Sequence, residues 1–212
     1  MRGLLQKDLC LLLQRSRVLF IFIGVGILIG CSTEDFFVIG YVTMLCAILT
    51  IGTISYDEFD NGYPFLLTLP ITKKIYVIGK YVFCLLGDMV GWVIAIIIYV
   101  GCSIAKGNGI TATELIETIS FIPAFCLITA IMLPLQLKYG AEKSRLVIAI
   151  VAGGALALGY IGTKLLPANS QISAFLSEIN DFTIMVGIWV IGLAALLISY
   201  MFSLHIMDKK EY

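Results

Sequence analysis

Six apolar stretches, separated by short polar segments, run through the chain. A bilayer core about 30 Å thick requires ~20 apolar residues in a helix, and most of these stretches approach or exceed that length. The first, residues 18–31, is short, and we extend it to residue 15 because Arg15 and Arg17 can snorkel to the headgroups. The predicted crossings cover about residues 15–31, 36–56, 77–105, 115–137, 146–166 and 182–207.

Residues 1–14 precede the first crossing and have an amphipathic pattern. Leucines recur at helical spacing on one side, and Arg2, Lys7 and Asp8 occupy the other. This pattern is typical of a helix that lies in the membrane interface. The alternative is a simple inward extension of the first crossing.

Positive charges are divided unevenly among the gaps between the apolar stretches. Of the 14 Lys and Arg residues, 12 fall into alternate gaps, and only Lys106 and Lys164 lie in the others. Lys and Arg in short loops accumulate on the cytoplasmic side of a membrane. The alternation therefore predicts six crossings with both termini in the cytoplasm.

The composition agrees with this pattern. Hydrophobic residues make up 60% of the 212 residues and charged residues 13%, whereas soluble domains are about 45–50% apolar and about 25% charged. We predict an all-α membrane protein with a single transmembrane domain over residues 1–212, in contact with the lipid bilayer. The net charge of zero is not informative about nucleic acid, because the charges are sorted by membrane side, and we predict no nucleic-acid partner.

The six cysteines are scattered, and the sequence has no CxxC motif. This spacing argues against a disulfide framework and against a zinc site. We interpret the cysteines as small apolar packing residues.

Residues suited to catalysis are sparse. His205 is the single histidine, and no cluster of Cys or carboxylate residues accompanies it. The sequence also lacks the GxxxxGK[ST] pattern of a P-loop. We therefore predict no catalytic residue, no metal site and no cofactor bound by this chain.

Asp88 is the one acidic residue inside the third predicted crossing. An ionisable group at such a depth costs about 2.5–3.5 kcal/mol on insertion scales, so it should face the bundle interior or a wet cavity. Two interpretations stay open. Asp88 either lines a cavity and takes part in coupling, or forms a hydrogen bond that locks neighbouring helices.

The longest predicted cytoplasmic segment covers residues 57–76. Acidic residues come first, a turn signal at Asn61-Gly62 follows, and a short apolar turn ends at Pro70. An exposed apolar turn is unfavourable unless it docks on something. The residues alone leave two choices open, a protein partner or the membrane surface.

Three motifs near this segment resemble those of small permeases of ABC-2 type ATP-binding-cassette transporters. They are Tyr56-Asp57-Glu58, then Leu69-Pro70-Ile71-Thr72-Lys73, then Lys80-Tyr81 at the start of the third crossing. The opening residues 1–9, which contain Lys7-Asp8, are also similar to that group. Within that group, the chain most resembles the small permeases of phenol-soluble-modulin exporters. The chain departs from the pattern at Tyr63-Pro64, where an aromatic residue followed by a polar one is more usual.

The resemblance implies that segment 57–76 is a coupling loop seated in a groove of a separate ATPase, and that residues 1–14 form an elbow helix. It implies two ATPase subunits, which hold ATP and Mg, and a second permease chain, identical or paralogous. A cargo path between the two permeases would be lined by Thr43, Thr50 and Thr53. The implied ATPase-contacting residues are Asp57, Glu58, Phe59, Asp60, Tyr63, Phe65, Leu66, Leu69, Pro70 and Lys73.

The function expected from the resemblance is that of the permease subunit of an exporter in the cell membrane, with amphipathic or antimicrobial peptides as cargo. The short predicted outside segments leave no room for a capture domain, which favours export. Sodium and drug export stay open within the same family. The alternatives from other classes are the substrate-binding membrane subunit of a vitamin importer and a membrane-embedded enzyme.

Overall fold

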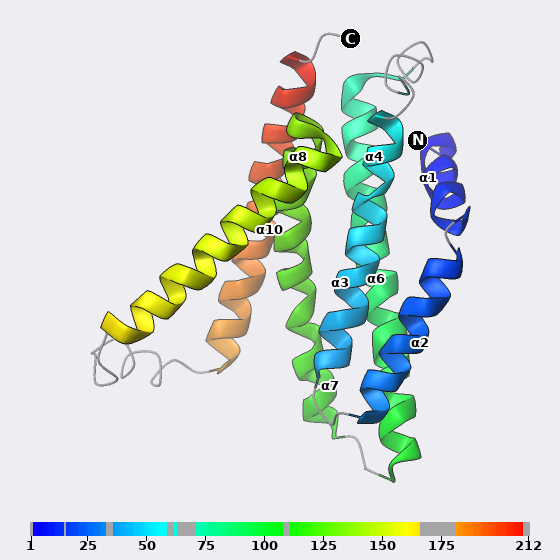
Figure 1. The fold of residues 1–212 in the computed structure, drawn as a ribbon, viewed down its shortest axis with the longest axis vertical. Coiled ribbons are helices and arrows are strands. Elements are labelled where there is room, and N and C mark those ends of the chain that lie inside the picture. Colours follow the sequence, from blue (N-terminus) through cyan, green and yellow to red (C-terminus); the bar gives the residue numbers. More distant parts are fainter. Residues whose placement is uncertain are drawn as a thin grey trace.

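The structure is a computed structural model, and it describes residues 2–14, 16–32, 36–58, 62, 71–107, 111–165 and 181–209. Within these ranges the regular elements are all helices (Figure 1). They are α1 (Arg2–Gln14), α2 (Ser16–Ser32), α3 (Phe37–Ile51), α4 (Thr53–Glu58), α6 (Lys73–Ala105), α7 (Ala112–Ile119), α8 (Phe121–Leu165) and α10 (Asp181–Lys209).

Several of these helices have the length and composition of membrane spans. In the described part of the chain, four qualify: Phe37–Glu58, Lys73–Ala105, Glu117–Gly140 and Met185–Lys209. The pair Arg2–Gln14 and Ser16–Ser32, bent by 66°, makes a fifth if it counts as one span. The fold class, an all-α membrane protein, is confirmed. The number of six crossings, their boundaries and the cytoplasmic position of the termini stay predictions.

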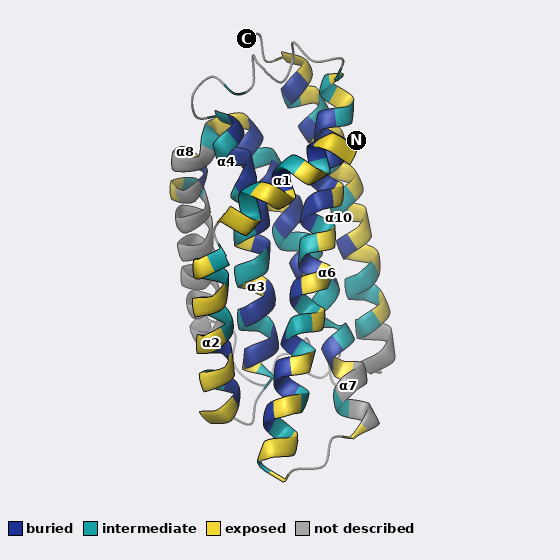
Figure 2. Cartoon of the chain, turned by 90° about the vertical axis from the view of Figure 1, so that its right-hand side faces the viewer, coloured by how far each residue is buried: buried dark blue, intermediate teal, exposed yellow. Residues whose placement is uncertain are grey.

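The outer surface of the bundle is apolar, as a lipid-facing surface must be. Phe20, Leu28, Leu197 and Met201 are each more than two-thirds exposed. Figure 2 shows exposed residues along the outward sides of α2 and α10. Such a surface would be costly in water, where solvent-exposed apolar patches are small.

Helix α6 is the central element, and it packs most extensively against α3. Its 33 residues extend about 50 Å at 1.5 Å per residue, more than the thickness of a bilayer core. It begins at Lys73, inside the segment that we predicted as a loop, because the Thr72 side chain accepts a hydrogen bond from the backbone N–H of Ile75.

Small residues allow α3 and α6 to approach closely. A Cβ atom at Gly87 would lie 2.2 Å from Thr50 Cγ2, and one at Gly91 would lie 2.6 Å from Cys46 Cβ. Any larger side chain would force the two helices apart. Gly87 and Gly91, which are four residues apart in the sequence, therefore serve helix packing inside the chain.

Helix α8 contains a sharp reversal at Gly140, where φ is 78° and ψ is 173°. Figure 1 shows the two parts of α8 running in different directions from this point. Positive φ suits glycine, and a Cβ atom here would also lie 2.8 Å from Glu58 Oε2. The end of α4 therefore meets the reversal in α8. The predicted crossing over residues 146–166 falls on the second part of this helix.

Among the described residues, the buried core has two parts. One lies near the start of α6 and contains Leu4, Ile54, Tyr76, Val77 and Leu137, among others. The second lies toward the end of α6 and contains Val38, Ile39, Val42, Ala95, Ile98, Tyr99 and Cys102. The first part includes Tyr76, whose hydroxyl donates to the buried Asp57, so it adjoins a group of buried charged residues.

Candidate functional site

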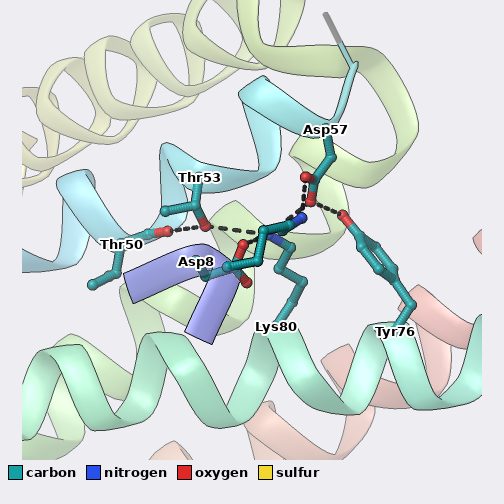
Figure 3. Close-up of polar contacts among 7 residues, drawn as sticks. Asp8, Thr50, Thr53, Asp57, Tyr76 and Lys80 are labelled. Atoms are coloured by element: carbon teal, nitrogen blue, oxygen red, sulfur yellow. Dashed lines mark hydrogen bonds and ion pairs between the residues drawn. The ribbon is translucent and has the colours of Figure 1, made fainter. Parts of the chain in front are cut away.

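Four charged side chains from three helices meet inside the first part of the core. Lys7 and Asp8 belong to α1, Asp57 to α4 and Lys80 to α6. Asp8, Asp57 and Lys80 are 2%, 4% and 1% exposed, although each is ordinarily a surface residue type. We call these four residues the ionic cluster. Figure 3 shows Asp8, Asp57 and Lys80 pointing toward one another.

Lys80 is at the centre of the cluster. Its Nζ lies 2.8 Å from Asp8 Oδ1 and 2.8 Å from Asp57 Oδ2, and it donates to Thr53 Oγ1 at 3.3 Å. An ammonium group has three donors, and these three acceptors use all of them. A buried cation is tolerated only when it is paired and hydrogen-bonded in this way.

Asp57 has two partners besides Lys80. Lys7 donates to Asp57 Oδ1, and the Tyr76 hydroxyl donates to Asp57 Oδ2 at 2.8 Å. Lys7 also forms an ion pair with Asp8 at 3.4 Å. With two lysines and two aspartates, the cluster has a formal charge of zero, so it can exist in an apolar core without an uncompensated charge.

Local sequence spacing brings the partners into position. Tyr76 and Lys80 are four residues apart on α6, so they project from one face of the helix. Thr53 and Asp57 have the same spacing on α4. The Thr53 hydroxyl also donates to the carbonyl of Thr50 at 2.8 Å, and this bond fixes its oxygen toward Lys80 (Figure 3).

The cluster contains residues from the helices that precede and follow residues 59–70 of the predicted coupling loop. Asp57 is at the end of α4, directly before residues 59–70, and Tyr76 and Lys80 are in the first turns of α6. Asp57, which the resemblance implied as an ATPase-contacting residue, is buried and bonded to partners in its own chain. In this conformation it is therefore not available at the surface.

The remaining predicted loop residues are only partly described. Glu58 lies next to Gly140 of α8. Lys73 donates to the carbonyl of Asp208 at 3.4 Å, which links the start of α6 to the end of α10. Outside the described residues lie Phe59, Asp60, Tyr63, Phe65, Leu66, Leu69 and Pro70.

Asp88 is buried in the middle of the bundle. Thr129 of α8 donates to Asp88 Oδ2 at 2.7 Å. The second carboxylate oxygen, Oδ1, is buried with no hydrogen-bond partner among the described residues. Asp88 thus connects α6 to α8, as the helix-locking interpretation requires. The interpretation that Asp88 takes part in coupling also stays open, because Oδ1 could accept a further hydrogen bond.

The three predicted path-lining threonines, Thr43, Thr50 and Thr53, are buried within the single chain. Each hydroxyl donates to a backbone carbonyl three or four residues earlier in the chain, at 2.8, 2.9 and 2.8 Å respectively. An open apolar groove of about 510 Å³ lies elsewhere, between α8 and α10, and Pro134, Ser199 and Phe202 contribute to its lining. A path between two permease chains stays a prediction.

Sequence reasoning missed a second polar network next to the ionic cluster. The Tyr81 hydroxyl forms hydrogen bonds with Ser199 and Ser203 of α10, and Ser199 donates to the carbonyl of Ala130 of α8. This network connects three helices. The Lys80-Tyr81 pair was visible in the sequence, but Ser199 and Ser203, the serine partners of Tyr81, are more than a hundred residues away from it.

Lys7, Asp8, Tyr76 and Lys80 were also absent from the predicted site. A signal did exist, because Lys7-Asp8 and Lys80 carry charge within or beside apolar stretches. We used both lysines as indicators of membrane side and as parts of the family resemblance, but we assigned neither of them a partner. Their pairing depends on how α1 packs against α6.

The comparisons with known proteins give one match. Residues 3–208 match the family model described as ABC-2 family transporter protein. Neither the curated proteins nor the solved structures provide a match. Because the match covers nearly the whole length, the chain belongs to the ABC-2 transporter family and is a membrane-spanning permease subunit of an ATP-binding-cassette transporter.

Proposed function

We propose that this chain is the permease of an ATP-driven exporter and that segment 57–76 couples it to a separate ATPase. The observation that carries the proposal is the ionic cluster, which ties together the two sides of the segment. Asp57 precedes residues 59–70, and Tyr76 and Lys80 follow them. A force applied to the segment is therefore transmitted to α4 and α6 together, and through Asp8 to α1 as well.

In this proposal the residues divide their roles. Phe65, Leu66 and Leu69 fill the groove of the ATPase. Asp57, through its contacts with Tyr76 and Lys80, fixes the start of the segment to α6. Closure of the ATPases around ATP then displaces the segment and tilts its flanking helices. ATP can drive this change only if it binds the closed pair of ATPases more tightly than the open pair.

The working unit in this proposal contains two ATPases and two permease chains, with the segment on the cytoplasmic side. The positions of the lysines support this orientation. Lys7, Lys73 and Lys80 lie at the end of the bundle where α4 ends and α6 begins, whereas Lys106 lies at the opposite end of α6. The proposed site of action is the cell membrane.

The test of coupling is the double substitution Leu66→Asp/Leu69→Asp. Two charges in an apolar contact should abolish co-purification of the ATPase or uncouple its ATP hydrolysis from transport. The matched control, Leu66→Met/Leu69→Met, retains apolar side chains of similar volume and should keep both activities. Transport-coupled ATP hydrolysis that survives the aspartates contradicts the assignment.

The proposed cargo is an amphipathic peptide. The short segments predicted outside the membrane support export rather than capture. Inverted vesicles that contain permease and ATPase should accumulate a labelled amphipathic helical peptide when ATP is added. A peptide of identical composition, with its residues reordered to remove the apolar face, is the control. Equal uptake of both peptides, or of neither, rejects this cargo.

A further inference from the structure

Two cysteines meet at the end of the bundle opposite to the ionic cluster. Cys31 is in the last turn of α2, and Cys102 is in the last turn of α6. Their sulfur atoms are 3.4 Å apart, although 71 residues separate them in the sequence. Both are free thiols in the structure. Neither the ionic cluster nor the proposed coupling segment uses them.

The two thiols have different surroundings. Cys31 is exposed, whereas Cys102 is buried in the second part of the core, among residues such as Val38 and Ile98. A Cβ atom at Gly30 would lie 3.1 Å from Cys102 Sγ, so the missing side chain at Gly30 allows Cys102 to reach α2. The pair therefore consists of one accessible sulfur and one sulfur protected directly behind it.

The distance suits a disulfide. An S–S bond is about 2.05 Å long, and the two sulfur atoms are 3.4 Å apart. They would therefore have to approach each other by less than the length of a carbon–carbon single bond to form the disulfide. The two cysteines come from separate helices packed side by side, and a bond between them would join α2 to α6 at this end.

We propose that Cys31 and Cys102 form a redox-active dithiol that an external disulfide converts to an intramolecular disulfide. The compartment of the oxidant rests on the orientation given in the proposed function, which places this end outside the cytoplasm, where disulfides persist. The thiol chemistry itself does not depend on that orientation.

The reaction is thiol–disulfide exchange in two steps. Cys31 loses its proton, and its thiolate attacks one sulfur of the external disulfide. This forms a mixed disulfide and releases one thiolate, which takes up a proton. The Cys102 thiol then loses its proton and attacks Cys31 Sγ, which releases the second thiolate, again protonated by solvent. Two protein thiols are oxidised, and one external disulfide is reduced to two thiols.

The experiment uses oxidised glutathione, which does not cross membranes, on the full chain with its ATPase in intact cells and in inverted vesicles. Free thiols are then blocked with N-ethylmaleimide, disulfides are reduced, and the released thiols are labelled with a PEG-maleimide. We expect two labels per chain in intact cells, and mass spectrometry should identify the linked Cys31 and Cys102 peptides. Oxidation in inverted vesicles alone would support the dithiol and overturn the proposed orientation.

Two variants separate the pair from other thiols. Cys31→Ser should abolish both labels. Cys102→Ser should stop at the mixed disulfide and give one label per chain. A variant with Cys10, Cys46, Cys84 and Cys126 replaced by alanine, which retains only the pair, should give the wild-type result. A single label on the wild-type chain, or a Cys31–Cys31 link between two chains, overturns the proposal.

Discussion

The contact between α6 and the first two helices is built differently at its two ends. Near the start of α6, α1 is held by buried charges, with Lys80 between Asp8 and Asp57. Near its end, α2 is held by apolar packing and by the contact between Cys31 and Cys102. Apolar contacts tolerate small changes in position, but a buried ion pair requires specific partners at specific distances.

Positional specificity in this permease is therefore concentrated at the charged end of the contact. The charged end adjoins the segment proposed to receive force from the ATPase, and the apolar end does not. Replacing Lys80, the buried centre of the ionic cluster, should therefore destabilise the protein far more than a comparable change in the apolar end. The following predictions test this comparison.

The largest effect is expected for Lys80→Met. It removes the central cation and leaves Asp8 and Asp57 buried with Lys7 as their only remaining lysine partner in the cluster. The cost should be about 3–5 kcal/mol in unfolding free energy, measured on protein in detergent by thermal or denaturant unfolding. Lys74→Met, on the same helix but at an exposed position, should change stability by less than about 0.5 kcal/mol.

A second substitution sharpens the result for Lys80. Adding Asp8→Asn to Lys80→Met restores a charge balance of one lysine to one aspartate. The double variant should regain part of the lost stability, so the two effects are not additive. Strictly additive losses would show that charge pairing is not the cause.

The next effect compares two glycines with nearly the same positive φ, Gly140 at 78° and Gly107 at 76°. Alanine at Gly107 meets no atom within 4 Å and should cost only the backbone strain, about 1–2 kcal/mol. Alanine at Gly140 also collides with the Glu58 carboxylate, so we expect roughly 2–4 kcal/mol in total. Equal losses in an unfolding assay would mean that the reversal in α8 does not depend on its contact with α4.

A smaller effect is expected for Thr129→Val, midway along the bundle. It removes the hydrogen bond to Asp88 and should cost about 1–3 kcal/mol, because a buried carboxyl loses its donor. Thr129→Ser keeps the hydroxyl and should cost clearly less. If both variants unfold like the wild type while only Thr129→Val loses transport, Asp88 serves function rather than helix packing.

The smallest effect is expected for Lys7→Met. The Lys7 side chain is 30% exposed, and without it Asp57 still has Lys80 and Tyr76. Partly exposed ion pairs contribute about 0–1 kcal/mol. Arg2→Met, on the same helix and exposed, is the control. A loss as large as that of Lys80→Met would remove the distinction between the centre and the rim of the cluster.

Much of the fold was predictable from local patterns. Apolar length and helical spacing do not depend on distant residues, so the runs behind α3, α6 and α10 indicated helices and a membrane protein directly. The Tyr56-Asp57-Glu58 and Lys80-Tyr81 motifs carried the resemblance that the family match later confirmed. These motifs also included half of the ionic cluster, but Asp57 was predicted to contact an ATPase and Lys80 was given no contact.

Contiguous residues were sufficient to indicate a membrane-embedded, all-helical permease of the ABC-2 family, because hydropathy and short motifs are local properties. The packing of the helices was needed to show that Lys80 lies between Asp8 and Asp57, and that Cys31 contacts Cys102. These contacts join residues on different helices, and the separation between them in sequence contains no information about distance. Packing of α1 and α2 against α6 creates both, with charge at one end and thiols at the other.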